Sequence, residues 1–261
     1  MALAWTLSGA SVDGIDIHWT SAGSGPKTVI LVHGWTCDES VWSAQVPALV
    51  AANYRVLTLD LPGHGQSGSP KDGKLSINLF ARAIEAVRKE AQVERLVLVG
   101  HSMGTPVIRE YARLYPHQTG GLVFADGVVV APGKGSRFLT LSARFSGPDG
   151  QKNREEFIRG MCVLTPDDMR ARILKVMMAP PDATASGAMA AMGDPAIWTD
   201  DAIDIPVLGI YADKSQLGDK ETMRRAFPNL EYVEIRGTDH FLMMEKPGEF
   251  NRLLLAFLRT H

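Results

Sequence analysis

The sequence has little of several features that would place it in a specialised class of protein. Its 261 residues include only two cysteines, Cys37 and Cys162. These two could pair, but because no secretion signal is present we expect reduced thiols in a cytoplasmic protein. No uninterrupted apolar run approaches the ~20 residues that span a bilayer, and the first residues lack the basic start of a signal peptide. The sequence therefore favours a soluble protein without a membrane span.

Charge of one sign is also lacking. The 27 Lys and Arg residues nearly balance the 29 Asp and Glu residues, which gives a net charge of −2. Because binding to nucleic acid normally needs a surplus of positive charge, we expect no nucleic-acid partner. A small-molecule substrate is the expected partner, and the sequence leaves the oligomeric state open.

Short apolar runs rich in branched residues alternate with longer segments that have helical spacing. The apolar runs are 28–33, 54–60, 95–100, 121–126, 205–213 and 232–236, and the helical segments are 42–52, 76–91, 104–115, 219–226 and 245–259. Continuous apolar runs are typical of strands covered on both faces. The alternation predicts an α/β fold with a mainly parallel sheet, whose ligands bind at the carboxyl ends of the strands.

The alternation is interrupted between residues 128 and 200. This stretch is polar and Gly-rich to about residue 153 and then has two helical patterns, the second with Thr165 as its expected N-cap and Pro166 at its first position. It holds six of the methionines, which either line an adaptable apolar surface or pack a small helical insert. Positive and negative charges balance here, so no charged substrate is predicted.

One motif combines a strand, a sharp turn and a helix. The run RLVLV is followed by Gly100-His101-Ser102-Met103-Gly104, which has the form G-x-S-x-G. Such a turn holds the serine in a strained backbone conformation, and its two glycines avoid collisions across the turn. The start of the following helix directs N–H groups at developing negative charge. We predict that Ser102 is a nucleophile.

Three further segments stand beside the serine motif in a characteristic order along the chain. His33-Gly34-Trp35 follows one predicted strand, residues 60–68 (DLPGHGQSG) follow the next, and Asp239-His240-Phe241 stands near the end. With the serine motif, these segments resemble the α/β-hydrolase superfamily. The resemblance implies the α/β-hydrolase fold, with a mainly parallel eight-stranded sheet flanked by helices. It implies one domain with a discontinuous core, 1–127 and 201–261, and an inserted α-helical cap, 128–200.

The resemblance also supplies partners for Ser102. The family's order of Ser, acid and His identifies His240 as the general base. Asp213 ends a predicted strand and is the favoured acid, whereas Asp126 ends another strand and is the alternative. Asp239 is interpreted as a residue of the loop. The resemblance places the oxyanion hole at the backbone N–H groups of Trp35 and Met103.

The expected substrate pocket is apolar and lies under the insert. Its expected residues are the Trp35 ring, Met161, Met177 and Met178. No cofactor is expected, because the G-x-G-x-x-G match at residues 63–68 precedes no helix that could hold a pyrophosphate. No metal is expected either, since the sequence has no paired Cys or H-E-x-x-H spacing.

The sequence as a whole predicts a serine hydrolase of carboxylic esters or lactones of small to medium apolar substrates. Ser102 would form an acyl-enzyme that water then hydrolyses. Two alternatives use the same triad, namely a cofactor-free perhydrolase and a hydrolase of C–C bonds. A ligand receptor on the hydrolase fold is the alternative without catalysis.

Overall fold

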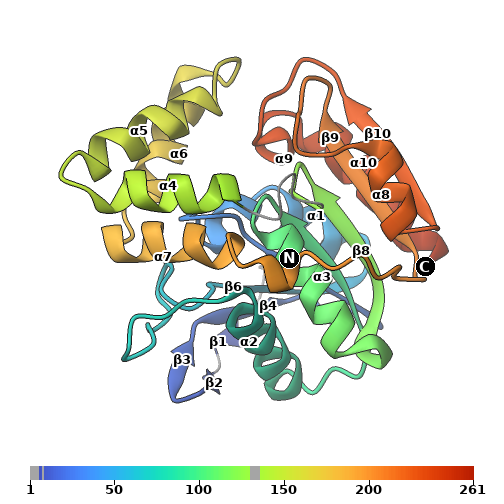
Figure 1. Cartoon of the computed structure of the whole chain (residues 1–261). Helices are drawn as coiled ribbons and strands as arrows, with labels where there is room; N and C mark the ends of the chain where they lie inside the picture. Colours follow the sequence, from blue (N-terminus) through green and yellow to red (C-terminus); the bar gives the residue numbers. More distant parts are fainter. Residues whose placement is uncertain (1–5, 8, 130–135) are drawn as a thin grey trace.

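The computed structural model describes residues 6–7, 9–129 and 136–261 and has an eight-stranded sheet at its centre (Figure 1). In spatial order the strands are β1 (Thr6–Leu7), β4 (Trp19–Ala22), β6 (Tyr54–Leu59), β5 (Lys27–Val32), β7 (Leu96–His101), β8 (Thr119–Ala125), β9 (Val207–Ala212) and β10 (Leu230–Ile235). The six strands from β6 to β10 in this order run parallel, and β4 and β1 complete one edge in antiparallel pairing. The strands β2 (Ala10–Val12) and β3 (Ile15–Ile17) form a separate antiparallel ribbon.

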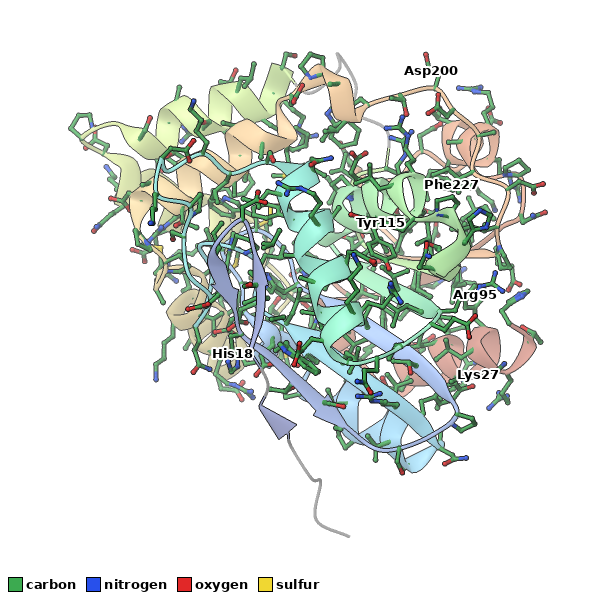
Figure 2. The ribbon with its side chains drawn as sticks, turned by 90° about the horizontal axis from the view of Figure 1, so that it is seen from below. His18, Lys27, Arg95, Tyr115, Asp200 and Phe227 are labelled. Carbon is green, nitrogen blue, oxygen red and sulfur yellow. The ribbon has the colours of Figure 1, made fainter. Side chains whose placement is uncertain are left out.

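Helices cover both faces of the sheet. In Figure 2, α2 (Ile77–Glu90) and α3 (Gly104–Leu114) lie on one side of the strands, and α1 (Gln45–Ala51) and α10 (Pro247–Thr260) lie on the other. Two further helices follow β9 and β10, namely α8 (Lys220–Ala226) and α9 (Leu242–Glu245). The structure also has the 3₁₀ turns η1 (Glu39–Trp42), η2 (Pro116–Gln118) and η4 (Pro195–Ile197). No helix that the structure describes is long and apolar enough to span a membrane.

The burial of the central strands explains their sequences. Residues 29–32 of β5 and every residue of β7 are buried, because helices cover both faces of these strands. Helix α2 begins where the Ser76 hydroxyl accepts a hydrogen bond from the N–H of Leu79 at 3.0 Å, and its apolar stripe is buried against the sheet. The predicted fold, a mainly parallel eight-stranded sheet flanked by helices, is confirmed.

Between β8 and β9, the described part of the chain has four α-helices, which we call the cap helices. They are α4 (Ser136–Ser146), α5 (Gly150–Gly160), α6 (Asp167–Met177) and α7 (Asp182–Met192). Figure 1 shows them grouped to one side, above the carboxyl ends of the strands. In Figure 2, Lys27 and Arg95, which stand at or next to the starts of β5 and β7, lie away from them.

Two local predictions for this segment are wrong. Helix α4 lies in the stretch interpreted as polar and Gly-rich, where Phe138 and Phe145 stand two turns apart and are buried. Helix α6 has Pro166 as its N-cap residue and starts at Asp167, so Thr165 lies outside the helix. The Thr165 hydroxyl instead contacts the loop that contains His240, and this tertiary contact replaces the expected capping bond.

Arg109, on α3, joins the two places where the chain passes between the sheet and the cap helices. Its side chain is 2% exposed, and it donates hydrogen bonds to the carbonyl groups of Val129, Ile197 and Thr199. Val129 follows β8, and the other two residues follow the cap helices. Burial lowers the pKa of the guanidinium, which has carbonyl oxygens rather than a carboxylate as its acceptors.

Candidate active site

Ser102 stands on the turn between β7 and α3 in the conformation that the sequence predicts. Its φ is +53°, in the left-handed region, and its N–H donates to the carbonyl oxygen of Ala125 at 3.1 Å. A Cβ atom at Gly100 would lie 2.5 Å from the carbonyl oxygen of Gly104, and one at Gly104 would lie 2.5 Å from that of Val32. Both positions therefore require glycine, because any side chain would collide with backbone.

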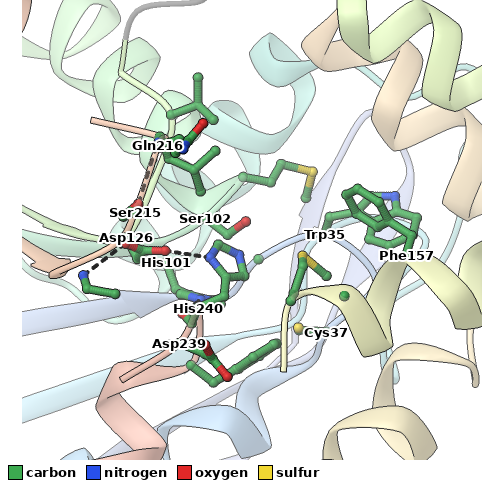
Figure 3. A pocket seen from close by; sticks show the side chains of 18 of the residues that line it. Trp35, Cys37, His101, Ser102, Asp126, Phe157, Ser215, Gln216, Asp239 and His240 are labelled. Atoms are coloured by element: carbon green, nitrogen blue, oxygen red, sulfur yellow. Dashed lines mark hydrogen bonds and ion pairs between the residues drawn. The ribbon is translucent and has the colours of Figure 1, made fainter. Parts of the chain in front are cut away.

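His240 and Asp126 meet at the carboxyl ends of the strands. His240 Nδ1 lies 2.7 Å from Asp126 Oδ2, and the two side chains are 8% and 4% exposed. The carboxylate can only accept, so Nδ1 carries the proton and Nε2 has a free lone pair. Figure 3 shows the Ser102 hydroxyl on the side of the imidazole turned away from Asp126. Ser102, His240 and Asp126 therefore lie in the order that a catalytic triad would require.

This geometry corrects the prediction for the acid. Asp213 follows β9 as expected, but its carboxylate accepts a hydrogen bond from the N–H of Gly237 at 3.1 Å and is partly exposed. Asp126 follows β8, the neighbouring strand, and its second oxygen accepts from the N–H of Ala212 at 3.1 Å. The imidazole approaches from the loop after β10 and reaches over the end of β9 to Asp126, so the alternative residue occupies the position expected for Asp213.

Backbone N–H groups lie beside Ser102, where the sequence predicts an oxyanion hole. Trp35 and Met103 line the same cavity as Ser102, and within the described chain neither amide donates a hydrogen bond. A Cβ atom at Gly34 would lie 2.9 Å from Ser102 Cβ, which shows how closely this loop approaches the serine. These two free amides can therefore stabilise an oxyanion formed at Ser102.

His33 fixes the shape of that loop. Its Nδ1 lies 2.8 Å from the carbonyl oxygen of Gly34, and its Nε2 accepts from the N–H of Leu61 at 2.9 Å. The ring is completely buried, and this desolvation lowers its pKa. A neutral ring protonated at Nδ1 satisfies both contacts, so His33 acts on the backbone of the loop.

The indole ring of Trp35 joins this loop to the cap helices. Its Nε1 donates to the carbonyl oxygen of Ala185 on α7 at 2.7 Å. The ring stacks on Phe145 with centroids 5.0 Å apart and meets Phe157 edge-on at 5.6 Å. Trp35 thus presents its amide to the cavity and its ring to the cap.

The cavity above Ser102 has a volume of about 360 Å³, within the usual range for small-molecule sites. Residues of the cap helices and residues at the carboxyl ends of the strands both line this cavity. Its apolar wall contains Trp35, Met103, Phe138, Phe157, Met161, Met177, Met189 and Met192. The predicted lining residues Trp35, Met161 and Met177 are therefore present, and Figure 3 shows Trp35 and Phe157 together on one side of it.

Met178, the fourth predicted pocket residue, is not among the residues that line this cavity. Its carbonyl oxygen accepts a hydrogen bond from Arg154 Nη2 at 2.7 Å, and its sulfur lies 3.4 Å from Arg154 Nε. The buried guanidinium thus holds Met178 in the structure of the cap. Phe138 and Phe157 line the cavity without having been predicted to do so, although their positions on amphipathic helices could have indicated buried faces.

Charged groups at the cavity differ in whether they have partners. The carboxylates of Asp126 and Asp239 accept hydrogen bonds from His240 and from the N–H of Thr165, respectively. Arg137 and Lys214 also line the cavity, and neither forms an ion pair within the described chain. Two cations thus lie at the cavity, and only Arg137, whose guanidinium is 5.3 Å from the centroid of the Phe138 ring, belongs to the segment whose charges balance in the sequence.

The two cysteines are free and buried. Desolvation raises the pKa of the Cys37 thiol, and it raises that of Cys162 to about 11. Because the thiolate is the reactive form, these thiols are poor nucleophiles at neutral pH.

The model of the Alpha/beta hydrolase family matches residues 29–253, which contain most of β5, the strands β6, β7, β8, β9 and β10, and the loop of His240. The chain belongs to the alpha/beta hydrolase family. This match agrees with the resemblance predicted from the sequence motifs, and it identifies the protein as a hydrolase.

Similar proteins within this fold carry out different reactions. A 2-hydroxy-6-oxononadienedioate/2-hydroxy-6-oxononatrienedioate hydrolase of Cupriavidus pinatubonensis is 28% identical over 261 residues, covering 93% of this chain and 90% of the relative. A bromoperoxidase from Bacillus anthracis is 24% identical with a TM-score of 0.83, covering 97% of this chain and 100% of that structure. An esterase from Thermogutta terrifontis is 21% identical with a TM-score of 0.83, covering 98% of each chain. The two structures show the fold, which by itself does not define the reaction.

Proposed function

We propose that this hydrolase cleaves carboxylic esters or lactones through Ser102, His240 and Asp126. His240 Nε2 takes the proton of Ser102 as its oxygen attacks the substrate carbonyl. The oxyanion accepts hydrogen bonds from the N–H groups of Trp35 and Met103. The protonated imidazole then gives its proton to the leaving alkoxide, and an acyl-enzyme remains. Water activated by His240 releases the acid and regenerates the serine.

The observation that carries this proposal is the 2.7 Å contact between His240 and Asp126, beside a serine held at φ +53°. The acid holds the imidazole in the tautomer that leaves Nε2 able to accept a proton. A structural pairing of these two residues would not require a strained serine and two unbonded amides at the same cavity. The apolar wall favours a substrate with an apolar acyl or alcohol group.

Labelling with a fluorophosphonate and turnover of nitrophenyl esters and lactones test this proposal. We expect the reagent to modify Ser102, and we expect Ser102→Ala to lower kcat by about 10⁴-fold or more, because the nucleophile is lost. Ser146→Ala, at an exposed serine that ends α4, is the control and should retain wild-type turnover. Turnover that persists in Ser102→Ala at the wild-type rate would refute the proposal.

A second candidate, hydrolysis of a C–C bond in a substrate with carboxylate groups, is favoured by Arg137 and Lys214. These cations line the cavity without carboxylate partners, and the relative from Cupriavidus pinatubonensis is named for a dioate substrate. The same triad would serve, but the leaving group would accept its proton on carbon. The ratio of kcat/KM for a 2-hydroxy-6-oxo-dienedioate to that for an uncharged ester separates the two: a ratio well below one favours the ester, and one well above it favours the second candidate.

A further inference from the structure

Residues 161–166, which join α5 to α6 and are called the connection below, contact the loop that contains His240. Asp239 Oδ2 accepts hydrogen bonds from the N–H of Leu164 and from the N–H of Thr165, the latter at 3.0 Å. The Thr165 hydroxyl donates to Glu245 Oε1 at 2.7 Å, and Glu245 Oε2 accepts from the N–H of Asp239 at 2.7 Å. Asp239, Thr165 and Glu245 thus form a closed cluster, in which each member bonds to both of the others.

The composition of this cluster makes it sensitive to the position of the cap. Two carboxylates face one hydroxyl, and within the described chain neither carboxylate has a Lys, Arg or His within ion-pair distance. Neutral donors from the connection therefore stabilise both negative charges, and Thr165 is only 1% exposed. Hydrogen bonds to charged groups are stronger than those between neutral groups, so moving the connection away would leave two adjacent carboxylates with too few donors.

The backbone of His240 is held from two sides next to this cluster. Its N–H donates to the carbonyl oxygen of Met161, at the end of α5, at 3.4 Å. Its carbonyl oxygen lies 2.9 Å from Nε2 of His101, at the end of β7. Burial holds the pKa of His101 well below its usual value, so the neutral ring donates from Nε2. The cap thus fixes one side of the His240 peptide, and the strand that carries Ser102 fixes the other.

We propose that Asp239, Thr165 and Glu245 are positioning residues that couple the seating of the cap to the placement of His240. When the connection is seated, the cluster holds the loop so that Nε2 faces Ser102. When the cluster is broken, the loop moves and proton transfer slows, even though every residue of the triad is present. This inference rests on the proposed function for its effect on catalysis, whereas the coupling itself depends only on the contacts.

Thr165→Val and Thr165→Ser form a matched pair that tests the coupling. Valine keeps the shape of the side chain and removes the hydroxyl, whereas serine keeps the hydroxyl. We expect Thr165→Val to lower kcat and the rate of fluorophosphonate labelling by about tenfold, with KM within twofold, and Thr165→Ser to restore both. We expect Asp239→Asn to act in the same direction and the double variant with Thr165→Val to lose less than the product of the two effects.

Hydrogen exchange provides a readout that does not depend on activity. We expect Thr165→Val to increase amide exchange in peptides covering residues 239–245, across the interface from the substitution. Asp219→Asn is the control, because this carboxylate caps α8 through the N–H of Thr222 and should change neither exchange in that loop nor kcat. Unchanged exchange in Thr165→Val would overturn the coupling, as would a rise in KM alone. Increased exchange in a protein whose Ser102 is not labelled would support the coupling and refute the proposed function.

Discussion

The carboxyl ends of β8 and β9 are neighbours in the sheet, and each is followed by an aspartate. Asp126, after β8, is 3% exposed and contacts both His240 and the N–H of Ala212. Asp213, after β9, is partly exposed and contacts the N–H of Gly237, in the turn after β10. One carboxylate thus faces the imidazole and the other fixes a backbone turn.

This comparison shows that the end of a strand determines where an aspartate lies, but not which group its carboxylate contacts. Both aspartates satisfy the same sequence rule, and parallel pairing brings both to the same edge of the sheet. Their roles differ because the loop after β10 directs the imidazole across β9. The end of β9 also contributes Lys214 to the cavity. We therefore expect the end of β8 to act in catalysis and the end of β9 to act in recognition.

Replacing each acid by its amide is the strongest test of this comparison. We expect Asp126→Asn to lower kcat by about 10⁴-fold, because the amide cannot hold the imidazole in the required tautomer. Asp213→Asn should retain kcat within about threefold. Steady-state kinetics on the same ester measures both, and the double variant should be no slower than Asp126→Asn. If Asp213→Asn alone abolished turnover, the roles of the two aspartates would have to be exchanged.

The two positions should also differ in their contribution to stability. Asp126→Ala leaves the buried N–H of Ala212 without its acceptor, and we expect the free energy of unfolding to fall by about 2 kcal/mol. Asp213→Ala removes a partly exposed bond, and we expect a loss of about 0.5 kcal/mol. Urea denaturation followed by circular dichroism measures both values. Equal losses would mean that burial does not distinguish the two strand ends.

The smallest effect is expected at Lys214. If the end of β9 recognises the substrate, Lys214→Gln should raise KM by about two- to fivefold for substrates with a carboxylate group and leave KM unchanged for matched neutral esters. High salt should reduce the difference in wild type, because it screens an exposed ion pair. Lys27→Gln, at the opposite end of the sheet, is the control (Figure 2). A change of equal size for neutral esters would indicate a steric effect.

The parts of the site that depend on local sequence could be predicted. The parts that depend on how distant segments meet in the fold could not. The turn at Ser102 follows from two glycines whose missing side chains make room for backbone, so a few residues were enough to predict it. The choice between Asp126 and Asp213 depends on a loop more than a hundred residues from one of them. No local pattern contains that information.

The segment of the cap helices shows the same limit. Thr165 has good capping chemistry, but a tertiary contact with Glu245 replaces the local bond. The sequence does not predict helix α4, because runs that contain Gly and Pro, 132–135 and 147–150, stand on both sides of it and indicate a loop. The sheet was predicted more completely, because long apolar runs in β5, β7 and β8 are buried on both faces.

The three carbonyl groups gathered by Arg109 have a consequence for how this molecule can be rebuilt. The chain departs from the sheet near Val129 and comes back near Ile197, and one guanidinium holds both crossings. An intervening segment whose ends are kept together can be shortened, lengthened or exchanged without moving the strands on either side. Residues 130–196 are therefore a segment that a graft could exchange. A graft that preserves the carbonyl acceptors of Arg109, and also the contacts of Met161 and Thr165 with the loop of His240, would change what enters the cavity while leaving Ser102, His240 and Asp126 in place.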